Sequence, residues 1–259
     1  MWNRLQLKEQ GKVDFKRNYW LCVLVSLILS ICMVSSSGGS AGRYAQDHDT
    51  TISSTTDATT AGDASSTIFA TAILAVASVV ALIGIILSIF VFTPIYIGGR
   101  RFYLENQFAP GQLNRLGYSF KEHRYGNVVL TMFLKNLFIT LWTLLLIVPG
   151  IVKGYSYWMM EYILAENPHL DQKRVFEISR QTMNGQKWNT FVLDLSFIPW
   201  YILSGITCGI VGLFYVQPYI DATRTRLYAV LRENALQRGI ATAEELPGYF
   251  PQVGNTMYQ

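Results

Sequence analysis

Long apolar runs alternate with short polar and basic stretches along most of this 259-residue chain. A helix needs roughly 20 apolar residues to cross a bilayer core of about 30 Å. The pattern therefore predicts an all-α, polytopic membrane protein with six transmembrane helices, several of them short enough to be tilted or kinked. The predicted spans are 19–34, 68–97, 128–148, 151–164, 188–203 and 208–220.

The spans pair into three helical hairpins whose second arms resemble one another. These arms read GIILSIFVFTPIYIGGR from residue 84, GIVKGYSYWMMEYILAEN from residue 150 and GIVGLFYVQPYIDATR from residue 209. Each opens with Gly-Ile and reaches Pro94, Glu161 or Pro218 about ten residues later, followed by a tyrosine and an isoleucine. This similarity predicts an internal threefold repeat.

We expect one membrane domain at 1–234, followed by a cytoplasmic tail at 235–259. The repeat units are about 1–106, 107–166 and 167–234, and each places an amphipathic helix on the membrane surface ahead of its hairpin. That helix is weakest in the first unit, because Gly11 interrupts it. The other two are predicted within 107–127 and 168–185.

Residues 35–67 are rich in Ser, Thr, Ala and Gly and carry several aspartates. Such a segment cannot bury enough apolar surface to offset the entropy of ordering it, so we expect a flexible exterior loop. A tolerated insertion is favoured over a binding role. The charged lead before residue 19 is long for a signal peptide, and we interpret the first apolar run as a span.

Basic residues cluster before the first predicted span and after the second, fourth and sixth, whereas the opposite side has only Arg43 and Lys153. The positive-inside rule then places both termini in the cytoplasm. With 51% hydrophobic and 15% charged residues, the net charge of +4 indicates topology and attraction to anionic lipid headgroups. No nucleic-acid partner is expected.

Charges within predicted spans are the candidate site residues, because burying a charge in a bilayer is costly. Lys135 and Asp194 lie at a similar depth, on the order of 10 Å below the inner boundary, and could pair. A structural bridge is favoured over a gated ion or proton site. Glu161 either reaches interfacial water or lines a cavity, and Asp221 is expected to form a surface ion pair with Arg224.

Prolines and glycines mark the predicted breaks in the spans. Pro149 and Gly150 begin the return arm of the second hairpin, and Pro94, Pro199 and Pro218 are expected to kink helices within the bundle.

Sequence motifs for known catalytic mechanisms are missing: there is no GxSxG, HExxH, Walker loop or GxGxxG motif. The cysteines and histidines are scattered, so no metal and no cofactor are predicted. We therefore expect a non-enzymatic scaffold or accessory protein, or one for envelope maintenance. The alternative is a transporter or channel for a small solute, ion or lipid. The scaffold role implies a protein partner in addition to the lipid bilayer.

Three segments, LLLIVPGIVKGYSYWMMEYILAENP, NGQKWNTFVLDLSFIPW and VQPYIDATRTRLYAVL, resemble signature segments of an uncharacterised bacterial membrane-protein family labelled domain of unknown function 975. The resemblance covers most of 1–234 apart from the Ser/Thr-rich loop. It implies a multi-pass protein of the bacterial cytoplasmic membrane and supplies no activity or site residue. In that family the position of Glu161 is often a proline, so this chain departs from the pattern there.

Overall fold

The computed structural model describes residues 2–36, 63–121 and 125–248, which form helices joined by short turns with no strand among them. The all-α prediction is confirmed. The elements are α1 (Arg4–Arg17), α2 (Tyr19–Ser36), α3 (Asp63–Leu87), η1 (Ser88–Phe92), α4 (Thr93–Asn106), η2 (Leu113–Gly117), α5 (Tyr118–Lys121), α6 (Tyr125–Leu145), α7 (Ile147–Ser156), α8 (Met160–Glu166), α9 (Gln172–Thr182), α10 (Lys187–Leu195), α11 (Ile198–Ile206), η3 (Gly212–Val216) and α12 (Gln217–Gln237).

Two helices within the described part of the chain are long and apolar enough to cross a membrane. One is the 32-residue stretch Ala75–Asn106, formed by α3, η1 and α4, and the other is the 21-residue α6. A third candidate arises if α1 and α2, which bend by 104° at their junction, are taken as one broken span. The structure thus supports two or three candidate spans, and six spans in three hairpins remain a prediction.

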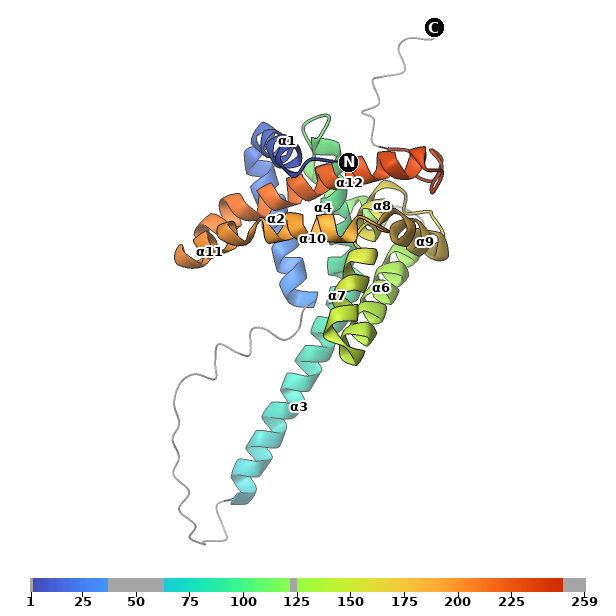
Figure 1. Cartoon of the computed structure of the whole chain (residues 1–259). Helices are drawn as coiled ribbons and strands as arrows, with labels where there is room; N and C mark the ends of the chain where they lie inside the picture. The colour runs from blue at the N-terminus through green and yellow to red at the C-terminus, as the bar shows by residue number, and fades with distance from the viewer. Residues whose placement is uncertain (1, 37–62, 122–124, 249–259) are drawn as a thin grey trace.

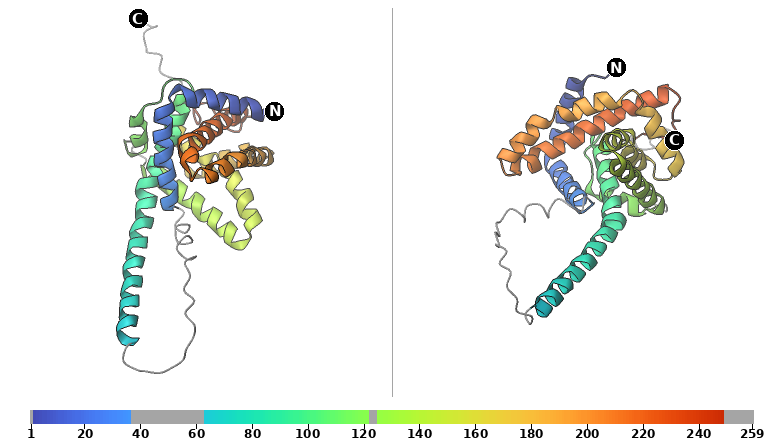
Figure 2. Two further views of the ribbon diagram at one scale, coloured as in Figure 1. Left: turned by 90° about the vertical axis from the view of Figure 1, so that its left-hand side faces the viewer. Right: turned by 60° about the horizontal axis from the view of Figure 1, so that its bottom comes forward.

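The remaining predicted spans are made of shorter helices. Predicted span 151–164 is interrupted between α7 and α8, and predicted span 188–203 is interrupted between α10 and α11, where Pro199 lies in the first turn of α11. In Figure 1, α3 extends away from the other helices, while α10, α11 and α12 lie across its direction. Figure 2 shows the same crossing from two further sides.

Pro94 and Pro218 occupy the same local structure. Each lies in the first turn of an α-helix that follows a five-residue π-helix, η1 or η3. The residues before the prolines, Thr93 and Gln217, each donate their backbone N–H to the carbonyl five residues earlier. Proline lacks an N–H and crowds the preceding turn, and a widened π-turn accommodates both effects without breaking the helix.

Glycines allow several helices to approach closely. A Cβ at Gly98 would collide with the Leu116 carbonyl of η2, and one at Gly99 would lie only 3.0 Å from Leu29 Cγ of α2. Gly11 does not interrupt α1 as expected: the helix is continuous, and a Cβ there would lie 2.8 Å from Thr223 Cα of α12. The glycine is required for packing rather than for a break.

The surface helices are found in part. α9 is amphipathic as predicted, with Val175 and Ile178 buried, and Asp171 caps its start. In 107–127 the described residues form only the short η2 and α5. Of the predicted exterior loop at 35–67, the ends belong to α2 and α3, and residues 37–62 lie outside the described part of the chain.

α12 is the central helix of the body and contacts α1, α2, α4 and α9. The chain then turns back, and Arg174 of α9 donates to the Ile240 carbonyl at 2.8 Å. Leu246 is fully buried in the same core. Packing therefore continues past residue 234, where the sequence placed the end of the membrane domain.

Candidate functional site

Four ionised side chains from four helices meet in the middle of the protein, and we refer to Lys135, Glu161, Arg100 and Asp221 as the central charge cluster. Lys135 Nζ of α6 lies 2.7 Å from Glu161 Oε1 of α8, and Arg100 Nε of α4 lies 3.0 Å from Glu161 Oε2. Arg100 Nη1 lies 2.9 Å from Asp221 Oδ1 of α12. The alternating signs give a neutral chain of four charges.

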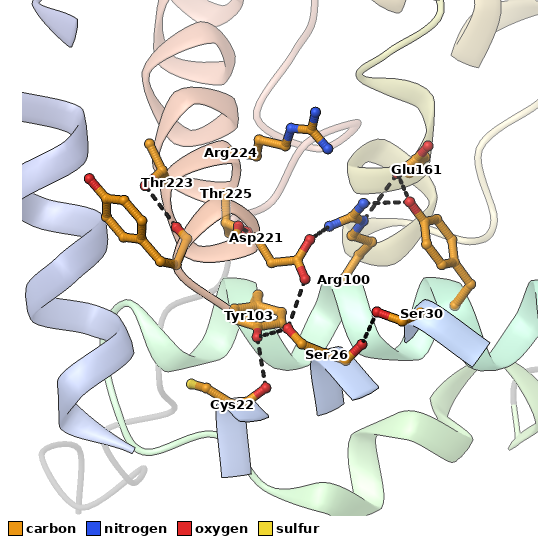
Figure 3. Close-up of polar contacts among 12 residues, drawn as sticks. Cys22, Ser26, Ser30, Arg100, Tyr103, Glu161, Asp221, Thr223, Arg224 and Thr225 are labelled. Carbon is orange, nitrogen blue, oxygen red and sulfur yellow. Dashed lines mark hydrogen bonds and ion pairs between the residues drawn. The ribbon is translucent and has the colours of Figure 1, made fainter. Parts of the chain in front are cut away.

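Uncharged groups complete the hydrogen bonding of the central charge cluster. Tyr96 donates its hydroxyl to Glu161 Oε2 at 2.7 Å and accepts from Arg100. Ser26 of α2 donates to Asp221 Oδ2 at 2.8 Å. Figure 3 shows Arg100 between Glu161 and Asp221, with Tyr103 and Ser26 beside the aspartate. The cluster thereby ties α2 to α4, α6, α8 and α12.

Burial makes these contacts matter energetically. The Asp221 side chain is 1% exposed, and those of Arg100 and Lys135 are 6% and 7% exposed. Removing charges from water costs several kcal/mol per ion, which only close pairing and full hydrogen bonding offset. Loss of Glu161 would leave Lys135 charged, buried and unpaired, and loss of Arg100 would do the same to Asp221. The cluster therefore specifies one arrangement of the five helices.

The Lys135 end of the cluster borders a cavity of about 250 Å³. Its walls come from α2, η1, α4, α6, α7 and α8, with Phe92 and Tyr96 among them, and from Trp158 in the turn between α7 and α8. Glu161 thus lines a cavity, which was one of the two outcomes considered from the sequence. Because the π-helix η1 supplies part of the wall, the helix distortion before Pro94 also shapes this cavity.

Asp194 belongs to a different cluster. Its carboxylate lies 3.0 Å from Arg224 Nη2 of α12 and accepts from the Tyr155 hydroxyl at 3.0 Å. Lys135 and Asp194, which were expected to lie at a similar depth and could have paired, do not form an ion pair. Lys135 pairs with Glu161 instead. Nor does Asp221 form a surface pair with Arg224: it is buried and faces Arg100.

Further ion pairs join α12 to its neighbours outside the central charge cluster. Asp14 of α1 pairs with Arg226, and Glu166 of α8 lies 2.8 Å from Arg232 Nε. Tyr228 also donates to Glu166. Burial raises the pKa of the Tyr228 hydroxyl well above its ordinary value, and the nearby Glu166 charge adds to the effect. This tyrosine therefore remains a neutral donor at physiological pH.

Sequence reasoning missed Arg100 and Asp221 as site residues. Arg100 was interpreted as part of the basic flank after the second span, and Asp221 as an exposed residue. The Gly98-Gly99 pair before Arg100 is a sequence signal that Arg100 is buried. Small residues at these positions let η2 and α2 pack closely against α4. The partner of each charge depends on contacts between helices distant in sequence, which no local pattern specifies.

The predicted turn and kink residues all lie at helix starts or close contacts. Pro149 is in the first turn of α7, whose N-cap is Leu146. A Cβ at Gly150 would lie 2.7 Å from Thr143 Cα, so this glycine lets α7 pack against α6. No group of three or more His, Cys, Asp or Glu side chains suited to a metal ion occurs among residues 2–36, 63–121 and 125–248.

Comparison with known proteins gives one match. Residues 47–235 match the family described as protein of unknown function (DUF975). No curated protein and no solved structure matches the chain. The matched region contains Arg100, Lys135, Glu161 and Asp221, so the whole central charge cluster lies within it. Since the match covers well over half of the sequence, this chain belongs to the DUF975 family.

Proposed function

We propose that this protein is a multi-pass membrane protein that catalyses no reaction and acts as a scaffold or accessory protein, or in envelope maintenance. The central charge cluster carries the proposal. A catalytic acid or base must exchange a proton with its substrate, but here each carboxylate is held by two or more donors from its own protein. The charges are used to fix helix packing.

Exposed apolar surface supports the membrane location. Most of the large apolar side chains described on α3 are more than half exposed, among them Val76, Val80 and Leu82. On either side of the turn between α6 and α7, Leu144 at the end of α6 is 83% exposed and Val148 at the start of α7 is 70% exposed. Water would make such surfaces unfavourable, whereas lipid chains cover them at no cost.

The distribution of basic residues supports a cytoplasmic location for both termini. α1, α9 and α12 carry many of the lysines and arginines and lie toward the end of the molecule opposite the start of α3 (Figure 1). We propose that this end faces the cytoplasmic surface of a bacterial cytoplasmic membrane, where anionic headgroups attract cations.

Purification in a mild detergent followed by native mass spectrometry tests the scaffold proposal. We expect a protein partner at a fixed stoichiometry, retained in two different detergents and absent from a matched preparation of an unrelated membrane protein. Recovery of the chain alone, in both detergents and from cells grown under several conditions, would contradict the proposal.

A transporter is the second candidate, and the cavity beside Lys135 and Glu161 is the observation that favours it. Proton flux into liposomes that contain the purified protein and an internal pH dye distinguishes a transporter from a scaffold. The scaffold proposal predicts no proton flux above protein-free liposomes after a pH jump. Flux that disappears in the double variant Lys135→Met/Glu161→Gln would support transport instead. The single exposed change Arg180→Met is the control.

A further inference from the structure

Residues 195–220, which we call the apolar hairpin, are too short to cross a bilayer and return. They contain no charged side chain and include α11, the turn after it and η3. Positive φ angles at Cys208 and Gly209, 50° and 84°, mark the turn that divides the apolar hairpin into two arms. Each arm of about 12 residues reaches at most about 18 Å, whereas a bilayer core is about 30 Å thick. The apolar hairpin can therefore occupy little more than one leaflet.

Charged side chains lie together at the base of the apolar hairpin. Asp194, just before the first arm, lies 3.0 Å from Arg224 Nη2, beyond the end of the second. Lys8 of α1 donates to the Ser196 carbonyl at 3.1 Å, and its Nζ lies 4.5 Å from the centroid of the Phe197 ring. The Asp194 and Arg224 side chains are 20% and 25% exposed. Partly exposed charges are favourable at the level of headgroups and water and costly in the hydrocarbon core.

Aromatic residues follow directly after these charges on both arms. Trp200 of α11 packs against Tyr215 of η3 and Tyr219 of α12, with ring centroids 5.5 and 6.0 Å apart. Tryptophan and tyrosine favour the zone between headgroups and acyl chains, because their rings are amphipathic. Charges followed by aromatic side chains are the order expected of a segment that enters a bilayer from one side.

The tip of the apolar hairpin is its most exposed part. Phe197 and Val216, nearer the base, are buried, whereas Ile206 and Ile210 beside the turn are 75% and 63% exposed. The turn between these two isoleucines carries no charge. Water would make such a surface unfavourable, and acyl chains would cover it at no cost.

The apolar hairpin also lies across the direction of a candidate span. In Figure 1, α10, α11 and α12 cross the direction of α3, and α11 lies at the end of the body away from α9. The second panel of Figure 2 shows the same three helices running together. Because α3 contributes to the candidate span Ala75–Asn106, its direction approximates the membrane normal. Helices that cross this direction lie near the membrane plane.

From these observations we infer that the apolar hairpin inserts into the cytoplasmic leaflet and does not cross the membrane. Its partner is a lipid surface: Lys8, Asp194 and Arg224 lie at headgroup level, and Ile206 and Ile210 lie among the acyl chains. The inference rests on the proposed membrane location and on the cytoplasmic position of the basic end. A segment inserted into one leaflet acts as a wedge, so its insertion depends on how densely the lipids are packed.

A fluorescent nitrobenzoxadiazole label on Cys208 tests the inference on the full-length protein in liposomes of phosphatidylethanolamine and phosphatidylglycerol. Cys22 and Cys32 are buried, and Cys208→Ser measures any labelling of them. We expect strong quenching by a phospholipid that carries a nitroxide on its acyl chain, and weak quenching by aqueous iodide present on both sides. Strong quenching by iodide with little quenching by the acyl-chain nitroxide would place the tip in water and overturn the inference.

A charge at the tip provides the second measurement. Ile206→Glu should remove most of the quenching by the acyl-chain nitroxide, because a carboxylate is costly among acyl chains and draws the tip toward water. Leu5→Glu is the matched control, since Leu5 on α1 is similarly exposed but lies outside the apolar hairpin. Equal quenching in the two variants would contradict insertion of the tip.

Carbonate extraction distinguishes this result from failure of the proposed function. A protein that stays in the membrane pellet but has Cys208 in water would overturn the leaflet insertion alone. A protein released by carbonate would instead contradict the membrane location on which the insertion rests.

Discussion

Arg100 of α4 and Asp221 of α12 form a buried ion pair, with Nη1 and Oδ1 separated by 2.9 Å. The two residues are 121 positions apart in sequence. Their pairing joins α4, the last part of the stretch Ala75–Asn106, to α12, the central helix of the body. Arg100 also contacts Glu161, so one guanidinium connects three helices.

Arg100→Met should destabilise the protein by about 3–5 kcal/mol, because it leaves two buried carboxylates without their arginine. Asp221→Leu should have a similar effect. The double variant should lose less than the sum of the two, since it removes the pair and not one partner. Unfolding in detergent, followed by intrinsic tryptophan fluorescence, measures this. Arg180→Met, on the exposed face of α9, is the control. Strictly additive losses would show that the pair is uncoupled.

Tyr162→Phe should leave stability unchanged or slightly higher. The Tyr162 hydroxyl is buried and has no hydrogen-bond partner among the described residues. Its ring stacks on Tyr228 at a centroid distance of 5.0 Å, a contact that phenylalanine keeps. Tyr228→Phe is the matched comparison and should cost about 1–3 kcal/mol, because it removes the donor to Glu166 Oε2, whereas Arg232 still donates to Oε1. Equal losses in the two variants would contradict the assignment of these hydroxyls.

Gly150→Ala should destabilise the contact between α6 and α7 by about 1–3 kcal/mol, since its Cβ would overlap the Thr143 backbone. Gly154→Ala, four residues later on the same helix, should be neutral or stabilising, because its Cβ meets open space and alanine favours helix. Thermal unfolding of the two variants under one detergent condition provides the measurement. The reverse order of stabilities would show that α7 packs differently.

Cys208 reports on the membrane arrangement of the third predicted hairpin. It is exposed in the turn after α11, whereas Cys22 and Cys32 are buried. If the chain crosses the membrane six times, the turn that contains Cys208 lies outside. A membrane-impermeant maleimide should then label Cys208 in intact cells. Labelling only after permeabilisation would place this turn on the cytoplasmic side, in keeping with α10–α12 lying across α3. Cys208→Ser is the negative control. The double variant Cys208→Ser/Arg180→Cys carries an exposed cysteine on α9 and provides the reference for a cytoplasmic position.

Acid should weaken the attachment of the C-terminal turn to α9. Arg174 lies 2.6 Å from Glu245 Oε1, and these hydrogen bonds hold the pKa of Glu245 below its ordinary value. A carboxylate with a lowered pKa stabilises the fold above its unfolded pKa of about 4.3, and this contribution is lost as pH falls through the lower folded value.

Glu245→Gln should therefore lower stability at pH 7 by up to about 1 kcal/mol, as expected for a partly exposed pair. The difference from the unchanged protein should disappear at low pH. Glu177→Gln, which removes the more exposed partner of Arg174, should show a smaller difference. Hydrogen exchange of residues 240–246 across pH 3–7 provides the measurement. A difference that persists at the acid end would contradict the role of Glu245.

The sequence by itself determined the helical class, the amphipathic α9 and the family, because these depend on local periodicity and on residue strings. It also located Lys135 and Glu161, since a charge within an apolar run is visible without a structure. Only the tertiary structure decided that these two residues pair and that Asp194 faces Arg224. It also replaced two predicted continuous spans with broken helices and moved Asp221 from the surface to the core. Close approach of helices at Gly11, Gly98 and Gly150 sets these partners, and such distances depend on the whole fold.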